Sequence, residues 1–260
     1  TQKRALQPTI SVVLKQREIN DSSLLKDSSS LHRFIVGKQH YYPEAVFGEV
    51  PDSVITQKTL FTEKINNKMV HYNEHLFKLK TFSGRRFLRQ GDFYNEQEYI
   101  RTLNNYNQIG AWQQVDGRTT TRNDTVDIHL VMTPALRQGF NFEVEASRNT
   151  GDFLGSNLIG ISLNMGYKNR NFGRRAIQMN TLLRNGVEFA FRGNNNVTEN
   201  FVQTIQTSLT HTFVFPKFVA PFNIKSFPGI DNIRTIAGLG YAHTDRRHFY
   251  VLSVATANWG

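Results

Sequence analysis

The sequence predicts an α+β domain followed by the N-terminal strands of an antiparallel transmembrane β-barrel. Helical and strand-like patterns alternate up to about Pro134, after which the helical period disappears. The later segments alternate apolar and polar residues, in runs near the ~9–11 residues that a tilted strand needs to cross a bilayer. We therefore expect 1–30 to be a linker or the remnant of a preceding domain, 31–134 to form the α+β domain, and 135–260 to supply about six barrel strands.

Composition narrows the classes of partner. The chain has 31 Lys and Arg against 21 Asp and Glu, a formal charge of +10, but the basic residues are spread singly or in pairs. A nucleic-acid partner is therefore not expected. Cysteine is absent, which excludes disulfides and thiolate sites, and no cofactor is expected. No run of about 18 apolar residues predicts a membrane helix, and the first ten residues lack the apolar segment of a signal peptide, so we expect a protein that is not exported or a trimmed piece of one.

The first domain shows strand and helix patterns in turn. "RFIVGKQHYY" (Arg33–Tyr42) predicts a strand that ends at Pro43. From Ser53 the apolar residues recur at helical spacing, which predicts a helix: Ile55, Leu60, Ile65 and Met69. Residues 111–134 predict a hairpin whose second strand alternates apolar with polar residues, the apolar ones being Val126, Ile128, Leu130 and Met132.

The clearest helix covers Asn95–Gly110. Asn95 and Glu98 have the spacing of a capping box, and Gly110 suits the C-terminal stop. Three apolar or aromatic residues share one face of this helix and are expected to pack on the sheet: Tyr99, Leu103 and Tyr106.

After Pro134 the period is two. "GFNFEVEAS" places Phe140, Phe142, Val144 and Ala146 on one face, and Asn141, Glu143, Glu145 and Ser147 on the other. "GISLNMGYK" repeats the pattern with Ile161, Leu163 and Met165. The runs "AIQMNTLL", "VEFAFR", "FVQTIQTSLTHTFVF", "IRTIAGLGYAH" and "FYVLSVATANW" continue it, separated by turn-rich segments.

Alternation does not decide whether the apolar face meets lipid or the core of a soluble sandwich. Two features favour lipid. The polar faces are rich in Gly, Ser, Thr and Asn, and aromatic residues stand near strand ends, at Phe201, Phe213, Phe215, Tyr241 and Trp259. "FVFPKFVAPF" (Phe213–Phe222) then indicates a strand that runs through the membrane interface into a turn. The residues predicted to face lipid are Phe140, Phe142, Ile161, Leu163, Met165, Phe213 and Phe215.

Several motifs resemble the BamA/TamA superfamily of outer-membrane protein assembly factors, the bacterial surface antigen family. "FLRQGDFYNEQEYIRTLNNYNQIGAWQQV" and "DTVDIHLVMTP" resemble the helix and closing strand of its POTRA domains. "RQGFNFEVEASRNTG" resembles the first barrel strand, and "YKNRNFGRRAI" the turn between the second and third strands. "FPKFVAPF" and "IRTIAGLGYAHTDRRHFYVLSVATANWG" resemble later barrel segments. The resemblance looks closest to the TamA-like lipoprotein type of Bacteroidota.

This resemblance implies a location and a role. It implies a barrel in the outer membrane of a Gram-negative bacterium and a POTRA domain at 31–134, with an insertion, in the periplasm. Client outer-membrane or exported proteins, outer-membrane lipids and accessory or periplasm-spanning assembly subunits would be the partners. The protein would guide clients into or across the membrane and would not be an enzyme.

In the family the first barrel strand meets the last at a weak seam, where an unpaired edge can template a client strand. The resemblance places this seam at Phe140, Asn141, Phe142, Glu143, Val144, Glu145, Ala146 and Ser147. The edge strand after Gly110 would hold extended client segments by the same backbone bonds.

Departures from the family keep alternatives open. The sequence ends after about six strands, which cannot close a sixteen-stranded barrel, and the family's lumen loop has no counterpart in it. A two-partner-secretion or passive transport barrel would share this architecture. "HYNEH" also fits the inverted zinc motif H-x-x-E-H, with His71, Glu74 and His75 on a helix and Glu96 or Glu98 as a further ligand, which would indicate a zinc hydrolase. The pairs Arg85–Arg86, Arg174–Arg175 and Arg246–Arg247 are expected in turns or at membrane rims.

Overall fold

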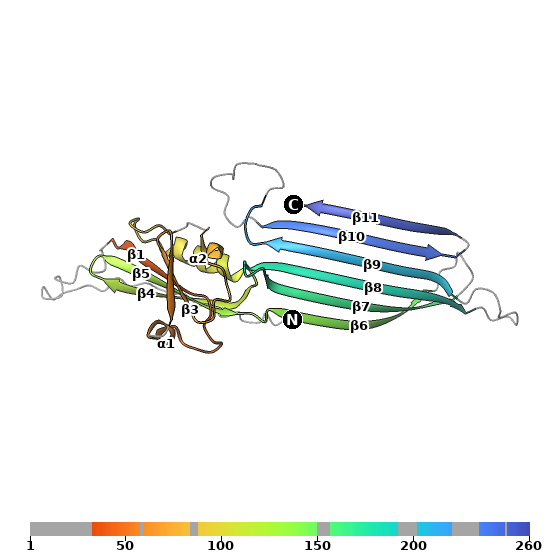
Figure 1. Ribbon diagram of the computed structural model, residues 1–260, viewed down its shortest axis with the longest axis horizontal. Helices are drawn as coiled ribbons and strands as arrows, with labels where there is room; N and C mark the ends of the chain where they lie inside the picture. Colours follow the sequence, from red (N-terminus) through yellow and green to blue (C-terminus); the bar gives the residue numbers. More distant parts are fainter. Residues whose placement is uncertain are drawn as a thin grey trace, which may run out of the picture. The chain divides into compact units, whose positions relative to one another are not determined.

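Two β-sheets follow one another along the chain in the computed structural model, which describes residues 33–57, 60–83, 88–149, 157–191, 202–219, 234–247 and 249–260 (Figure 1). The predicted linker at 1–30 lies outside these residues, as do Phe201 and Arg85–Arg86. None of the described helices is long and apolar enough to cross a membrane.

The first sheet has five strands in the order β2-β3-β1-β5-β4. Its elements are β1 (Ile35–Tyr42), α1 (Pro51–Ile55), β2 (Phe61–Ile65), β3 (Lys68–Tyr72), the 3₁₀ turn η3 (Leu79–Phe82), α2 (Glu96–Asn107), β4 (Trp112–Arg122) and β5 (Thr125–Pro134). The central strand β1 runs parallel to both β3 and β5, while the β2–β3 and β4–β5 pairs are antiparallel hairpins. This unit is therefore an α+β sheet whose two outer strands are β2 and β4.

The helix predicted from Ser53 is wrong. Among its described residues the helix α1 ends at Ile55, and residues 61–72 form the β2–β3 hairpin. Its turn is built on Asn66, whose backbone is left-handed (φ 52°), a conformation that Asn tolerates better than most residues. Of the four apolar residues at helical spacing, Ile65 belongs to β2 and Met69 to β3, while Ile55 ends α1 and Leu60 precedes β2. Pairing of β3 with β1 therefore overrides the local period.

The helix predicted from Asn95 is confirmed. The Asn95 side chain accepts a hydrogen bond from the N–H of Gln97 at 2.9 Å, and Gly110 adopts φ 69° after the last turn. The carboxylate of Glu98 lies 3.6 Å from the guanidinium of Arg101. Among the described hydrogen bonds, the one that caps the start of the helix is therefore made by the Asn95 side chain.

Helix α2 covers one face of the first sheet. Tyr106 is completely buried there, and its ring meets those of Tyr41 and Trp112 edge-on at 5.7 and 5.9 Å. Tyr99 and Leu103 pack at the border of this core. They lie over Gly117 of β4, where a Cβ atom would collide with the Tyr99 hydroxyl, so the glycine permits the close approach of helix and strand. The predicted packing face of the helix is confirmed.

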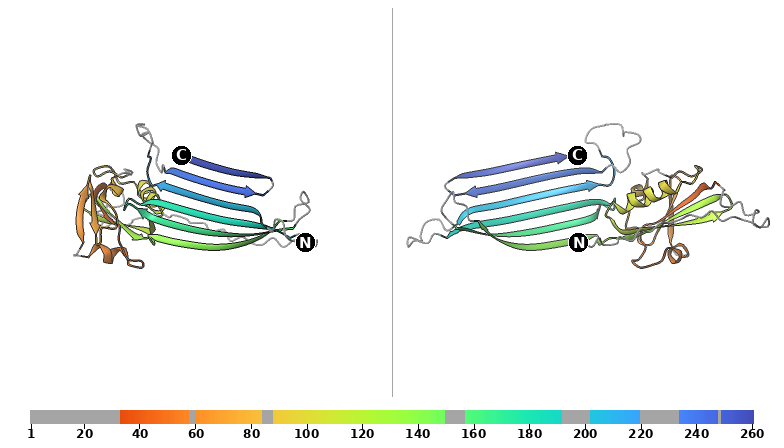
Figure 2. Two further views of the ribbon diagram at one scale, coloured as in Figure 1. Left: turned by 45° about the vertical axis from the view of Figure 1, so that its right-hand side comes forward. Right: turned by 180° about the vertical axis from the view of Figure 1, so that it is seen from behind.

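The second sheet is a six-stranded antiparallel meander in sequence order (Figure 2). Its strands are β6 (Gln138–Asn149), β7 (Asn157–Phe172), β8 (Ile177–Phe191), β9 (Val202–Phe215), β10 (Thr235–Arg246) and β11 (Tyr250–Trp259). Strand β8 joins the two runs expected at "AIQMNTLL" and "VEFAFR" over Ile177–Phe191, and its pairing with β7 continues through Gly186 opposite Ser162. Every strand is at least as long as the ~9–11 residues needed to cross a bilayer, since the shortest has 10.

Candidate functional site: the faces and edges of the β6–β11 sheet

One face of the β6–β11 sheet is mainly apolar. Register places Phe142 opposite Met165, Val144 opposite Leu163, and Ala146 opposite Ile161. The same face continues across the sheet through Leu183, Leu209 and Tyr241. Phe140 is 81% exposed and Phe142 is 67% exposed, so none of the described residues covers this part of the sheet face. We call it the apolar face. All seven residues predicted to face lipid belong to it by register; their contact with lipid stays a prediction.

The opposite face, the polar face, carries small and charged side chains. Six glycines of these strands are all on it: Gly139, Gly160, Gly166, Gly186, Gly238 and Gly240. The charged residues include Glu143, Glu145 and Arg184. Glycines lower the steric bulk on one side of a sheet, and designed curved sheets use them on purpose. A sheet with bulk on one face and glycines on the other is suited to curve around the polar side.

The segregation has exceptions on both faces. The apolar face includes polar side chains that bond to a cross-strand neighbour: Thr181 with His211 at 2.8 Å, Thr207 with Asn185 at 2.9 Å, and His243 with Ser253 at 2.8 Å. Each pair satisfies part of its own hydrogen-bonding capacity, which lowers the cost of facing an apolar solvent. On the polar face, β11 contributes the apolar residues Leu252 and Val254.

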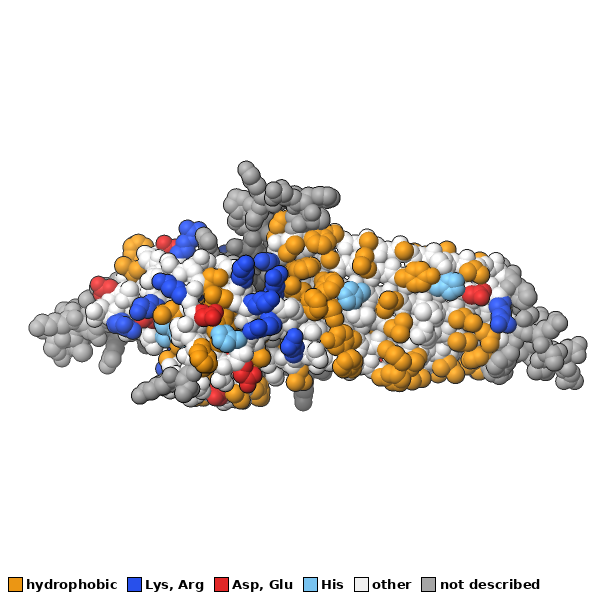
Figure 3. Space-filling model, in the orientation of Figure 1, with side chains coloured by type: hydrophobic (Ala, Val, Ile, Leu, Met, Phe, Trp, Pro, Cys, Tyr) orange, Lys and Arg blue, Asp and Glu red, His pale blue; other side chains and the backbone are white. Residues whose placement is uncertain are grey.

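Aromatic rings gather at one end of the β6–β11 sheet. Phe172 contacts Phe213 with ring centroids 5.5 Å apart, and Phe215 lies 6.2 Å from both Phe213 and Trp259. On the neighbouring strands Phe140 and Tyr167 meet at 4.9 Å. Figure 3 shows hydrophobic side chains concentrated at this end, beside a group of Lys and Arg side chains. Aromatic girdles of this kind mark the level of lipid headgroups in membrane barrels.

The first strand of this sheet, β6, has a free edge. Within the described residues β6 pairs with β7 and with no other strand, and β11 likewise pairs with β10 alone. All residues of the predicted seam, Phe140–Ser147, lie inside β6 and are exposed. The seam strand is thus present as an edge strand, while its pairing with a client is untested. The strand after Gly110, β4, is also an edge strand, as predicted.

The predicted zinc motif does not have its required geometry. His71 lies in β3 and His75 lies in the following turn with φ 55°, so the two histidines do not share a helix face. Glu96 and Glu98 belong to α2. The described part of the chain contains no group of three or more His, Cys, Asp or Glu side chains arranged to hold a metal ion.

The structure instead places His71 in a row that the sequence did not reveal. Strands β2, β3, β1, β5 and β4 contribute, in order, Thr62, His71, His40, His129 and Thr120. Thr62 bonds His71 at 2.8 Å, His71 bonds His40 at 2.9 Å, and His129 bonds Thr120 at 3.1 Å. The rings of His40 and His129 stack at 4.7 Å. The sequence signal that could have revealed this row is the alternation of side chains between the two sheet faces. In β1, β3 and β5 it puts one histidine per strand on the face away from α2.

Burial disfavours the charged form of these histidines. It lowers the pKa of His71 and of His129 to about 4, and the neighbouring His40 adds to the effect in both cases. Burial also lowers the pKa of His40, against the attraction of Asp127. The row is therefore neutral at pH 7 and stabilises the sheet through stacking and hydrogen bonds.

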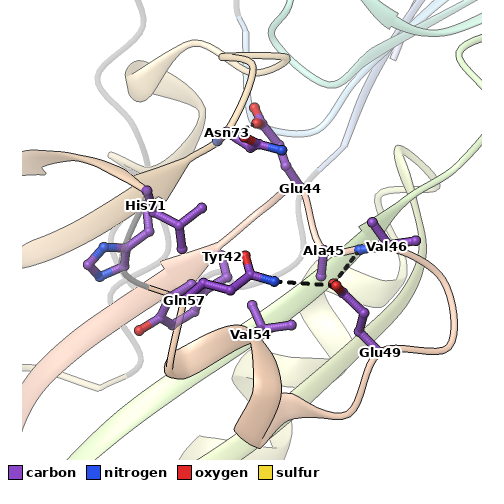
Figure 4. Close-up of a pocket in the computed structure, with 10 residues that line it drawn as sticks. Tyr42, Glu44, Ala45, Val46, Glu49, Val54, Gln57, His71 and Asn73 are labelled. Carbon is purple, nitrogen blue, oxygen red and sulfur yellow. Dashed lines mark hydrogen bonds between the residues drawn. The ribbon is translucent and has the colours of Figure 1, made fainter.

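A small pocket of about 130 Å³ lies beside this row (Figure 4). The two carboxylates that line the pocket, those of Glu44 and Glu49, already accept hydrogen bonds from the protein. Glu49 accepts hydrogen bonds from the N–H of Val46 at 2.9 Å and from Gln57 at 3.3 Å. Glu44 accepts three backbone N–H groups, from Asn73, Glu74 and Leu76. These bonds fix the loops around the pocket, so its acidic groups have a structural role.

Comparison with known proteins gives a coarse likeness. A solved structure, BamA from Haemophilus ducreyi lacking POTRA domains 1–3, aligns with 77% of this chain and 47% of its own chain, at 13% sequence identity and a TM-score of 0.30. The chain thus spans about half the length of that protein. No family model and no curated protein matches the sequence. At this identity and score the likeness carries no conclusion about function.

Proposed function

We propose that this chain is the periplasmic POTRA domain and the first barrel strands of an outer-membrane assembly factor. In this proposal the β6–β11 sheet forms part of a closed barrel, with its apolar face in lipid and its polar face lining the lumen. The protein guides client β-barrels or exported proteins into or across the outer membrane. No bond is broken, so no catalytic group is required.

The observation that carries the proposal is the free edge of β6. This strand is 12 residues long, and its exposed residues alternate between the apolar and the polar face. Inside a bilayer each unpaired backbone N–H or C=O costs several kcal/mol, so such an edge must find a partner strand. A closing strand of the same protein supplies that partner at rest, and a client strand supplies it during insertion.

The α+β unit supports the other half of the proposal. Strands β1, β5 and β4 with α2 give the parallel pair, the hairpin and the helical cover that the POTRA-like motifs imply. The β2–β3 hairpin extends the same sheet on the far side of β1 and is the proposed insertion. Because β4 is an edge strand, its outer backbone groups are available to an extended client segment before the segment reaches the membrane.

Site-specific disulfide formation tests this role. Full-length protein with Asn141→Cys or Ser147→Cys in β6 is presented in proteoliposomes with a client barrel that carries single cysteines in its terminal strand. We expect crosslinks that require the β6 cysteine and shift with register along the client strand. The matched control is Asn180→Cys, on the same face but in β8, which already has a partner on both sides.

Equal crosslinking of β6 and β8 would contradict strand templating. A barrel that fails to accelerate client insertion but passes one dedicated substrate would instead support the two-partner-secretion alternative, which has the same sheet but needs no open edge.

A further inference from the structure

The turn between β7 and β8 is docked on the segment that follows β3. The Asn171 side chain donates to the carbonyl of Leu76 at 2.9 Å, and the Lys78 N–H donates to the carbonyl of Arg174 at 2.7 Å. The Arg174 guanidinium donates to the carbonyl of His75. Asn171 also accepts the N–H of Ala176, which closes its own turn. The first barrel turn and the α+β unit therefore form one junction, held mainly by backbone groups.

Unfavourable backbone conformations are concentrated at this junction. Five described residues other than glycine have positive φ: Asn66, His75, Asn123, Arg174 and Ala176. Asn66 and Asn123 occupy hairpin turns, where Asn is tolerated. The other three are at the junction, with φ between 55° and 62°. Residues other than glycine held in this region are strained, and such residues cluster at functional sites.

A cavity of about 240 Å³ opens between the two docked segments. Phe77, Ala111 and Pro134 contribute its apolar part, while Arg137, Arg174 and Glu74 contribute its charges. Its volume is below the roughly 300–1,000 Å³ of pockets for drug-sized ligands, so it suits a small polar head with the start of an apolar tail.

The charge of the cavity and its surroundings is positive. Arg137 and Arg174 are exposed, and neither takes part in the ion pairs of the described residues. Arg170, Arg175, Lys78 and Lys80 belong to the same docked segments. Glu44 lies close by, but its carboxylate is occupied by three backbone N–H groups. Planar guanidinium groups bind phosphate oxygens in a bidentate manner, which gives this arrangement a preference for phosphate.

The cavity also lies at the aromatic end of the β6–β11 sheet. Phe172, which contacts Phe213, belongs to the same turn as Asn171 and Arg174. Leu136, next to Arg137, is 86% exposed. An exposed leucine, a line of aromatic rings and a group of arginines occur together where hydrocarbon gives way to headgroups.

We propose that the junction cavity binds the phosphate headgroup of an anionic glycerophospholipid from the periplasmic leaflet. This inference rests on the proposed membrane position of the β6–β11 sheet. Arg137 and Arg174 hold the phosphate, and Leu76 and Pro134 contact the glycerol end of the lipid. Because both docked segments line the cavity, the bound lipid joins the α+β unit to the first barrel turn and fixes its angle to the membrane.

Lipid binding to purified full-length protein tests the proposal. The protein in a neutral detergent is titrated with dioctanoyl phosphatidylglycerol, with dioctanoyl phosphatidylcholine and with inorganic phosphate, and bound ligand is counted by native mass spectrometry. We expect one site that prefers phosphatidylglycerol. Arg137→Gln should weaken it about ten-fold, the loss expected for one hydrogen bond to a charged group. Glu74→Gln should leave binding unchanged or tighten it, since it removes a negative charge.

Arg148→Gln is the matched control, because Arg148 is an exposed arginine near the far end of β6, the strand that Arg137 directly precedes. Arg174→Gln could disturb the turn, so the Arg137 variant decides the outcome. Unchanged affinity in Arg137→Gln, or an equal loss in Arg148→Gln, would overturn the site. Equally tight binding of inorganic phosphate would show a free-anion site in place of a lipid site.

Heat-modifiable gel mobility, which reports whether a barrel has formed, distinguishes failure of the lipid site from failure of the proposed function. A wild-type protein that forms a barrel but binds the two lipids equally contradicts the lipid site alone. A wild-type protein that forms no barrel contradicts the proposed function on which the site rests.

Discussion

The guanidinium of Arg184 on β8 lies 3.2 Å from the carboxylate of Glu145 on β6, across the intervening strand β7. The hydroxyl of Ser162 on β7 donates to the same carboxylate at 3.1 Å. Three neighbouring strands are thus linked on the polar face, and the link begins at the strand with the free edge. Both charged side chains are about half exposed, at 44% and 48%. Their interaction is therefore screened by solvent in the proposed lumen.

The first prediction concerns this pair. A double-mutant cycle with Glu145→Gln and Arg184→Gln should give a coupling free energy below about 1 kcal/mol, as for other exposed ion pairs. The measurement is urea unfolding of the full-length barrel in detergent at low and high salt. A coupling well above this range that resists salt would show a desolvated pair, and the polar face would then not line an aqueous lumen.

The second prediction concerns the two faces of β6. Nitroxide labels placed singly at each position from Phe140 to Ser147 should alternate between lipid and water, with Phe140, Phe142 and Val144 in lipid. The reason is the period of two that register with β7 imposes. Collision rates with oxygen and with a water-soluble relaxant measure this directly in reconstituted membranes. Uniform access to water along the strand would contradict the membrane barrel and indicate a soluble β-sheet.

The third prediction concerns α2. Leu103→Asp should destabilise the α+β unit by about 3 kcal/mol or more, because a charge would be placed beside the buried Tyr106 and Trp112. Asn104→Asp is the matched control on the exposed side of the same helix and should change little. The chain has two tryptophans, so with Trp259→Phe in the background the fluorescence of Trp112 reports urea unfolding of this unit. Equal midpoints for the two variants would refute the packing.

Sequence patterns predicted the strands and α2 well, because each has a local signal. The period of two along Phe140–Ser147 and the cap at Asn95 both act within a few residues. The segment after Ser53 has apolar residues at helical spacing, yet it forms β2 and β3. Pairing with β1 decided that outcome, and such pairing joins residues far apart in the chain.

The junction and the histidine row were beyond sequence patterns for the same reason. His40, His71 and His129 are 31 to 89 residues apart and meet only through the strand order β3-β1-β5. The sequence predicts Arg174 in a turn or at a membrane rim. Its contact with His75 joins residues far apart in the chain, so it could not be predicted from a local pattern. The seam residues could be placed on an edge strand from the resemblance, while the role of that edge depends on pairing that a sequence pattern does not show.

The fourth prediction follows from the histidine row. Burial lowers the pKa of His71 and His129 from 6.5 to about 4, so unfolded chains bind more protons than folded ones between these values. The stabilisation is therefore complete above about pH 6.5 and is lost as the pH falls toward 4. The groups facing the row are Asp127, Arg122 and Lys38.

Urea unfolding followed by Trp112 fluorescence at pH 7 and pH 5 measures this effect. The midpoint should fall at pH 5 in the wild type, and His71→Asn with His129→Asn should remove most of that fall. A pH dependence that is unchanged in the double variant would show that other groups are responsible.

The last prediction concerns the free edge of β6. Alternate residues of an antiparallel strand direct their N–H groups to opposite sides, so of Glu143 and Val144 one donates toward β7 and the other toward the open edge. Proline removes the N–H at its position and does not fit a paired strand. Glu143→Pro and Val144→Pro should therefore differ: one disturbs the barrel's own ladder, and the other removes a donor that a client strand needs. Glu143→Gln keeps the backbone and should be nearly silent.

The most direct measurement is the rate at which proteoliposomes containing each full-length variant insert an unfolded client barrel. Heat-modifiable mobility first identifies the proline variant that retains its own barrel. The proposed function predicts that this folded variant inserts clients much more slowly than Glu143→Gln, which should match the wild type. Wild-type insertion by the folded proline variant would contradict strand templating at β6, and loss of activity in Glu143→Gln alone would indicate a conduit governed by lumen charge.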